Sequence, residues 1–70
     1  MYRLFRLNDG FQFIGNVGNP PIIGNVSRVS KYDDSPEHWA TGTVLEILDR
    51  TERRIVFKTK SSIYVWEDIV

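Results

Sequence analysis

The chain contains no cysteine, so it forms neither a disulfide bond nor a metal site built on thiolates. His38 is its single histidine, which excludes an imidazole cluster. No apolar run approaches the roughly 20 residues that cross a bilayer as a helix. The N-terminal apolar stretch is too short, and too rich in arginine, for a secretory signal. We therefore expect a cytoplasmic protein with no membrane partner.

The chain also lacks an excess of charge of either sign, with nine basic and nine acidic residues. Zero net charge argues against attraction of the whole molecule to nucleic acid or to an anionic membrane. The charges are spread unevenly, because Asp33, Asp34 and Glu37 form an acidic block and residues 50–60 are locally basic. Nucleic acid is therefore a disfavoured partner, although a local basic face is present.

Residues 1–70 are expected to form a single small β domain with a thin core. A chain of this size buries only roughly 60% of its unfolded surface. Without disulfides or a metal, stability must come from aromatic packing or from self-association. Aromatic residues make up 13% of the chain, which supports aromatic packing.

Residues 2–17 predict an antiparallel hairpin, because two apolar and aromatic runs flank the turn sequence Asn-Asp-Gly at 8–10. A three-residue loop over 8–10 would place Phe5 opposite Phe13 and gather four apolar groups on one face. A two-residue turn would instead set Arg6 opposite Phe13. The pattern of side chains favours the three-residue loop.

Residues 22–31 then predict a linking strand, and residues 32–40 predict a loop. A short helical turn is expected near 35–39. Ser35 suits the N-cap of such a turn, and Pro36 suits its first helical position.

Residues 41–70 predict a meander of three strands joined by two tight polar turns. Four residues of one parity are expected to face the core: Leu45, Ile47, Ile55 and Phe57. The first turn, around 49–52, can hold three or five residues with this parity preserved. A five-residue loop would also set Glu46 opposite Lys58, an attractive pair.

The last strand of this meander is apolar on both faces. Ile63 and Val65 occupy one face, and Tyr64 and Trp66 occupy the other. If the preceding turn is longer or shorter by one residue, the other pair of side chains faces the core. The sequence leaves both orientations open.

These elements predict an all-β fold of about five antiparallel strands. At this length we expect a small SH3-like or OB-like barrel, or a strongly curved meander sheet. An open sheet that dimerises through one face is the alternative. Trp39 is expected to fold back and plug one open end of the barrel.

Enzyme chemistry is not expected, because His38 with Ser35 and the acidic block lacks a second segment that would bring converging groups. The same acidic residues show neither EF-hand nor zinc spacing, so no metal is expected. The glycine-rich stretch 15–24 carries two prolines and no phosphate-loop signature. No catalytic residue, metal or cofactor is predicted.

The strongest candidate site is an interaction surface on the C-terminal meander. If Ile63 and Val65 face inward, an apolar and basic stripe lies outside, and its members are Val56, Lys58, Lys60, Tyr64 and Trp66. Such a stripe suits a protein partner or a second copy of the chain. The same aromatic and basic groups suggest single-stranded nucleic-acid binding as an alternative, by stacking of bases.

The segment 41–70 resembles a loosely defined group of small uncharacterised β proteins from phage- and plasmid-derived regions of Gram-positive bacteria. The matching residues are the strand entry Thr41-x-x-Val44 and the pattern Phe57-x-Thr59-x-Ser61-x-x-Tyr64. Tyr2-Arg-Leu followed by Asp9-Gly10 is compatible with this group. The resemblance implies an accessory role in a mobile element and transfers no catalytic residue.

Overall fold

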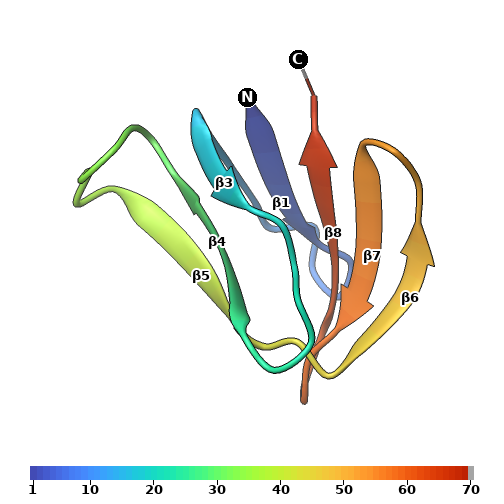
Figure 1. The fold of residues 1–70 in the computed structure, drawn as a ribbon. Coiled ribbons are helices and arrows are strands. Elements are labelled where there is room, and N and C mark those ends of the chain that lie inside the picture. The colour runs from blue at the N-terminus through green and yellow to red at the C-terminus, as the bar shows by residue number, and fades with distance from the viewer. Residues whose placement is uncertain (70) are drawn as a thin grey trace.

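The computed structural model describes residues 1–69, and these form eight β-strands and no helix. All neighbouring strands are antiparallel (Figure 1). The strands are β1 (Tyr2–Arg6), β2 (Gln12–Gly15), β3 (Val17–Asn19), β4 (Val26–Ser30), β5 (His38–Thr43), β6 (Glu46–Arg50), β7 (Arg54–Lys58) and β8 (Ile63–Asp68).

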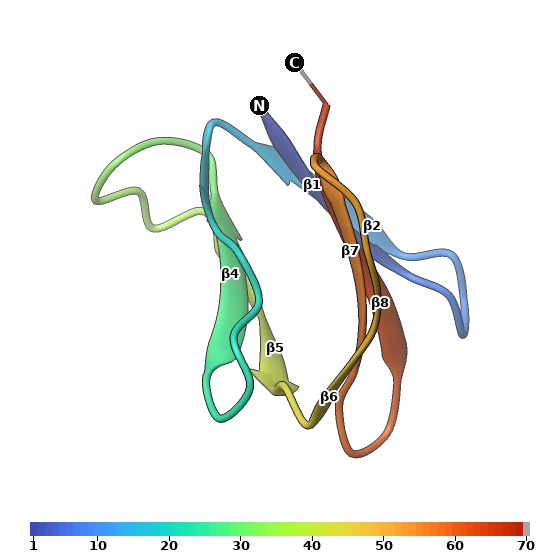
Figure 2. The same ribbon diagram turned by 45° about the vertical axis from the view of Figure 1, so that its right-hand side comes forward.

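The strands lie in two sheets that face each other as layers (Figure 2). The larger sheet has five strands in the order β2-β1-β8-β7-β6, and the smaller has three in the order β3-β4-β5. The last strand of the chain therefore lies between the first and the seventh. The chain passes from one sheet to the other at two corners, between β2 and β3 and between β5 and β6.

The first corner lies at Asn16, which separates β2 from β3. Asn16 N donates a hydrogen bond to Lys31 O at 3.2 Å, which holds the corner against the end of β4. Gly15 is buried here, and a Cβ atom at its position would collide with the carbonyl group of Ser30. The two backbones approach so closely that only glycine fits.

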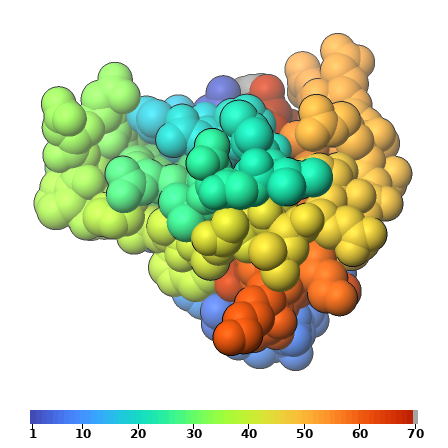
Figure 3. Space-filling model, turned by 60° about the horizontal axis from the view of Figure 1, so that its bottom comes forward, coloured from blue at the N-terminus to red at the C-terminus, as the bar shows by residue number. Residues whose placement is uncertain are grey.

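The second corner lies at Val44 and Leu45. Val44 N donates to Asn25 O at 2.8 Å, and Gly24 N donates to Val44 O at 2.9 Å. Leu45 N then donates to Lys58 O at 2.8 Å, so the next residue already belongs to the larger sheet. Figure 3 shows the teal segment before β4 lying against the yellow segment between β5 and β6. This corner is thus held by backbone hydrogen bonds on both sides.

The core lies between the layers and is rich in aromatic and β-branched side chains. Its buried members are Leu4, Val29, Val44, Ile55, Phe57, Tyr64 and Trp66. Trp66 stacks on Tyr2 with ring centroids 5.2 Å apart, and Tyr64 stacks on Phe57 at 5.5 Å. Such pairs contribute about 0.5–1.5 kcal/mol each beyond the burial of area.

The predicted all-β class is confirmed, but the described strands form two sheets and no closed barrel. The structure has more strands than predicted because the chain bends at two places inside predicted extended segments. One bend lies at Asn16 in the predicted hairpin, and the other lies at Val44 and Leu45 in the predicted meander. The strand expected over 22–31 is limited to Val26–Ser30, and the loop expected over 32–40 contains the start of β5.

The helical turn predicted near 35–39 is not formed, because β5 begins at His38. Ser35 Oγ accepts a hydrogen bond from Glu37 N at 3.0 Å, which closes a short turn in place of a helix cap. Lys31 N donates to Glu37 O at 3.0 Å, and the pairing of β4 with β5 begins directly afterwards. Strand pairing therefore overrides the local helical preference.

The predicted three-residue loop of the N-terminal hairpin is wrong, because Leu4 lies opposite Phe13 and Phe5 lies opposite Gln12. Arg6 N donates to the carbonyl of residue 11, so four residues, 7–10, form the loop. Gly10 has a φ of 76°, a left-handed conformation that glycine adopts without steric cost. The longer loop puts Leu4 in the core and turns Phe5 to the opposite face.

In the meander, the predicted core positions of Ile55 and Phe57 are confirmed, and Ile47 packs against the core. Leu45 is 54% exposed, so its predicted core position is wrong. Glu46 lies opposite Lys58 as the longer-loop alternative proposed. A shift of register between Ile47 and Asp49 makes this pairing compatible with a short turn, in which Thr51 N donates to Arg54 O.

The orientation of β8 is now defined. Tyr64 and Trp66 are 5% and 8% exposed and belong to the core. Val65 is 9% exposed and lies on the opposite face, outside the core cluster. The two aromatic rings carry far more apolar area than Ile63 and Val65, so this orientation buries the larger share between the layers.

We predict that Gly15→Ala destabilises the fold strongly, because the added Cβ forces β2 away from Ser30. Gly42→Ala is the matched control, since a Cβ there meets only the Thr59 Cβ at 3.9 Å, an ordinary contact. Urea unfolding of both variants checks this expectation. Equal midpoints for the two variants would contradict the close approach at position 15.

Trp66→Ala should lower the free energy of unfolding by about 3–5 kcal/mol, because it removes the largest buried ring. Lys60→Ala, in the exposed turn before β8, should change it by less than about 0.5 kcal/mol. Thermal unfolding followed by near-UV circular dichroism measures both. A Trp66→Ala variant as stable as wild type would place that ring outside the core.

Candidate interaction surface

The face of the five-stranded sheet that points away from the core carries the candidate site. Side chains alternate along a strand, so residues between the core positions of β1, β7 and β8 point outward. We call this surface the outer face. Its residues are Arg3, Phe5, Leu7, Arg54, Val56, Lys58, Ile63, Val65 and Glu67.

The register of the sheet arranges the outer face in rows across the strands. Phe5, Val65 and Val56 lie side by side in the central row. On one side is a charged row in which Glu67 of β8 lies between Arg3 and Arg54.

On the other side of the central row, Leu7 N donates to Ile63 O at 2.9 Å, and Ile63 lies opposite Lys58. The centre of the face is therefore apolar, and the charged groups lie at its margins.

The outer face is hollowed rather than flat. A groove of about 480 Å³ is lined by the charged row, by the central row and by Leu7. Val65 is nearly buried at its centre, whereas Leu7 is 52% exposed at its end. Phe5 and Val56 are half-buried. An apolar groove with a charged margin is a common form of protein-binding surface.

The charged row contains an ion pair between Arg3 Nη2 and Glu67 Oε1 at 2.6 Å. Both side chains are partly exposed, at 34% and 24%, so the pair adds little to the stability of the fold. Arg3 Nε is buried and has no hydrogen-bond partner among the described residues. One donor of the Arg3 guanidinium group is therefore unpaired within the described part of the chain.

The residues of the predicted interaction surface are not brought together. Val56 and Lys58 lie on the outer face, and Lys60 is exposed in the turn before β8. Tyr64 and Trp66 lie inside the core. The prediction depended on Ile63 and Val65 pointing inward, and β8 has the other orientation.

Sequence reasoning missed the contribution of the N-terminal hairpin to this surface, which is Arg3 and Phe5 of β1 and Leu7 of the loop. The signal was hidden by the error in the hairpin loop, which assigned Phe5 and Leu7 to the apolar face of the hairpin. Arg3 and Glu67 are far apart in the sequence, and their pairing on one face can be recognised only when β1 is known to pair with β8.

Two aromatic side chains pack against Arg6. Its guanidinium group lies 5.1 Å from the centre of the Phe11 ring and 5.5 Å from that of Trp39. Trp39 in turn packs against Tyr64, with ring centroids 5.7 Å apart. Trp39 was predicted to plug one end of a barrel from a loop, but it lies on β5 and the described strands form no closed barrel.

Arg6 also forms two hydrogen bonds to Asp9, with Nε to Oδ1 at 2.9 Å and Nη2 to Oδ2 at 2.8 Å. Asp9 Oδ1 accepts a further bond from Phe11 N at 3.1 Å. These bonds lower the pKa of Asp9 below its usual range, the Arg6 contact being the largest cause. The same contact raises the pKa of Arg6.

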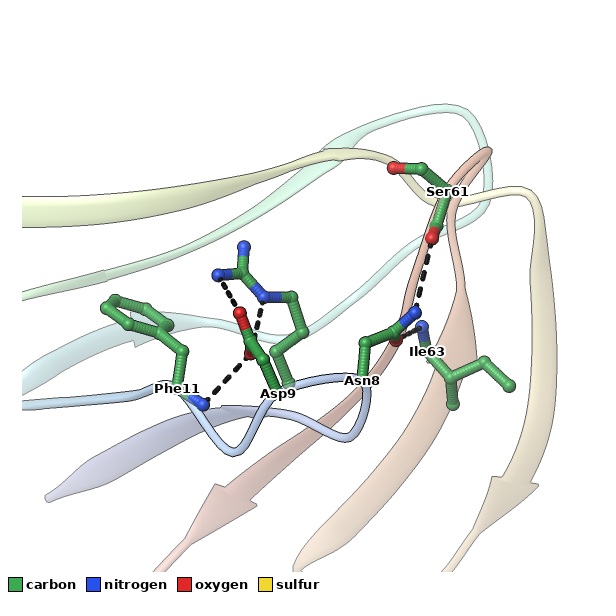
Figure 4. A network of polar contacts seen from close by, with 6 residues as sticks. Asn8, Asp9, Phe11, Ser61 and Ile63 are labelled. Carbon is green, nitrogen blue, oxygen red and sulfur yellow. Dashed lines mark hydrogen bonds and ion pairs between the residues drawn. The ribbon is translucent and has the colours of Figure 1, made fainter.

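The hairpin loop is tied to the last strand by Asn8 (Figure 4). Asn8 Oδ1 accepts a hydrogen bond from Ile63 N at 3.1 Å, and its Nδ2 donates to Ser61 O at 3.5 Å. Figure 4 shows Asn8 and Asp9 pointing to opposite sides, one toward β8 and the other toward Phe11. The loop that carries Leu7 is thereby positioned beside Ile63 on the outer face.

Polar groups also lie outside the outer face. His38 is exposed at the start of β5. A smaller hollow of about 160 Å³ lies beside Arg28, Tyr32 and Asp34 on the smaller sheet. Among residues 1–69, no three His, Asp or Glu side chains are grouped so that they could hold a metal ion. In the same part of the chain no helix has the length and apolar character needed to cross a membrane.

Comparisons of the chain with protein-family models, with curated proteins and with solved structures find no match. The resemblance of the meander to small β proteins of mobile elements stays a prediction. Val70, the last residue of the resembling segment, lies outside the described residues.

We predict that Asp9→Asn lowers the stability of the fold at neutral pH and that this loss vanishes in acid. A lowered pKa in the folded state means that ionised Asp9 stabilises the fold above its ordinary pKa of 3.8. The contribution disappears as the pH falls through the lower, folded-state pKa. Urea midpoints of both proteins at pH 7 and near pH 2 measure the difference.

Asp33→Asn is the matched control, because Asp33 lies on an exposed loop. We expect its midpoint to follow that of wild type at both pH values. A constant gap between Asp9→Asn and wild type across the range would mean that the contact with Arg6 does not depend on the charge of Asp9.

Proposed function

We propose that the chain is a non-enzymatic protein-interaction module and that the outer face of its five-stranded sheet is the binding surface. The observation that carries the proposal is the central row of Phe5, Val65 and Val56, which is apolar although it points away from the core. In an antiparallel sheet with one solvated face, outward positions are usually polar. A partner that covers this row removes its apolar area from water.

The margin of the groove supports the same proposal. Arg3, Arg54 and Lys58 combine long aliphatic stems with charged ends, so they can pack against a partner and remain solvated. Glu67 adds an acceptor between two of these cations. An apolar centre within a polar rim is the usual anatomy of a specific protein interface.

The alternative, single-stranded nucleic-acid binding, is less well supported. That function needs aromatic rings on which bases can stack. Tyr64 and Trp66, the rings proposed for this role, are 5% and 8% exposed. Phe5 is the only aromatic residue of the outer face as defined above, and the net charge of the chain is zero.

An accessory role in a mobile element belongs to the same proposal, and its support is the resemblance of residues 41–70. A likeness to SH3-like barrels is also part of it. The support for that likeness is the way in which the chain bends from one sheet into the other at two corners, a feature of small barrels built from few strands.

Site-specific photo-crosslinking tests the binding surface. Lys58 is replaced by benzoylphenylalanine, because it is exposed on the outer face and its replacement leaves the core intact. After irradiation of the cells that naturally produce the chain, we expect discrete covalent products. The products are measured by immunoblot and mass spectrometry.

The control carries the same crosslinker in place of Arg28, which is exposed on β4 of the smaller sheet. We expect no discrete product from this position. Equal product patterns from positions 58 and 28, or no product from position 58, would reject the outer face as a binding surface.

A further inference from the structure

We propose that the partner of the outer face is a second copy of this chain, and that the two copies pack around a two-fold axis running between β1 and β8. The proposal rests on the proposed function, because it uses the same surface. The argument comes from the residues that β1 and β8 place side by side. On the outer face, each adjacent pair across these two strands consists of groups that attract each other.

Three such pairs occur along the β1–β8 ladder. Arg3 lies opposite Glu67, and Phe5 lies opposite Val65. Leu7 continues this pairing next to Ile63, since Leu7 N donates to Ile63 O. One pair is an ion pair and the other two are apolar.

A two-fold axis parallel to the strands, halfway between β1 and β8, exchanges the two members of every pair. Arg3 of one copy then faces Glu67 of the other, and the reciprocal contact forms at the same time. Phe5 faces the second copy's Val65, and Leu7 faces the second copy's Ile63. Every contact at the centre of this arrangement joins opposite charges or two apolar groups, as a self-complementary interface requires.

The arrangement also agrees with the geometry of stacked sheets. An axis parallel to the strands keeps the strand directions of the two sheets aligned, and twisted sheets that pack face to face stay within about 30° of alignment. Outside the two central strands, the half-buried Ile14 on β2 lies at the level of Arg3, opposite the second copy's Arg54. The stem of Arg54 can cover this apolar side chain.

Other placements of the axis are less complementary. An axis through β8 itself places Glu67 opposite the Glu67 of the second copy. It also places Arg3 opposite the Arg54 of the second copy, so like charges meet in both contacts. An axis between β8 and β7 places Phe5 against Asp49, the residue opposite Val56 on β6. Of these three placements, only the axis between β1 and β8 avoids both a like-charge contact and an apolar residue set against a carboxylate.

A charge exchange between copies tests the proposal. Arg3→Glu gives a chain with Glu at both positions 3 and 67, and Glu67→Arg gives a chain with Arg at both. Each variant alone should dimerise about tenfold or more weakly than wild type, because like charges face each other twice. An equimolar mixture should form heterodimers with an affinity within about threefold of the wild-type dimer, because both intermolecular pairs are restored.

The measurements are sedimentation equilibrium and native mass spectrometry over micromolar to millimolar concentrations, a range that covers weak self-association. Circular dichroism verifies that each variant is folded. The ion pair is partly exposed, so its loss should leave the monomer intact. For the wild-type chain, NMR amide shifts of the outer face should move with concentration while those of β4 stay constant.

A control pair of variants tests whether heterodimers form because of the charges at positions 3 and 67 or only because the two variants carry opposite net charges. Arg28→Glu and Glu37→Arg change the net charge by the same amounts at exposed positions away from the outer face. Each of these variants should homodimerise like wild type, and their mixture should show no preference for heterodimers beyond the statistical one.

A wild-type chain that stays monomeric at millimolar concentration would overturn the inference. So would a mixture of Arg3→Glu and Glu67→Arg that associates no better than the control pair. Crosslinking at position 58 then separates the two proposals. Products with other proteins alone would leave the interaction module in place without self-association, and an absence of products would remove both.

Discussion

β8 is the strand on which the rest of the molecule depends, because it pairs along its whole length with β1 on one side and β7 on the other. It joins the N-terminal hairpin to the C-terminal meander, and without it the five-stranded sheet would divide into two parts. Its inward residues, Tyr64 and Trp66, contact rings from β1 and β7 at once. A single strand therefore sets the sheet order and supplies the largest part of the aromatic core.

The same central position explains why the outer face is apolar at its middle. A strand that is paired on both sides has no free edge, and its outward side chains are surrounded by neighbours on both flanks. Val65 is nearly buried in this way although no second layer covers it. Leu7 and Lys58, which flank Ile63 at one end of β8, are more exposed, so burial on this face decreases away from Val65.

Local patterns in the sequence correctly predicted features that depend on residues close together in the chain. Alternation placed Ile55 and Phe57 in the core. The errors concern contacts between distant segments. The hairpin loop is lengthened while Asn8 bonds to β8, 55 residues away, and β5 forms because β4 pairs with it. Which face of β8 is buried could not be read from its own residues, since both faces are apolar.

The pairing of Tyr2 with Asp68 places the two ends of the described chain side by side, as the neighbouring strands β1 and β8 in Figure 1 show. A force that pulls these ends apart acts across the β1–β8 ladder, in the direction of its hydrogen bonds. The bonds would then open one after another from the ends, like a zipper, rather than all together in shear. A domain whose core is closed by its last strand is therefore mechanically soft along this axis, and the first bonds to open are those that join its two halves.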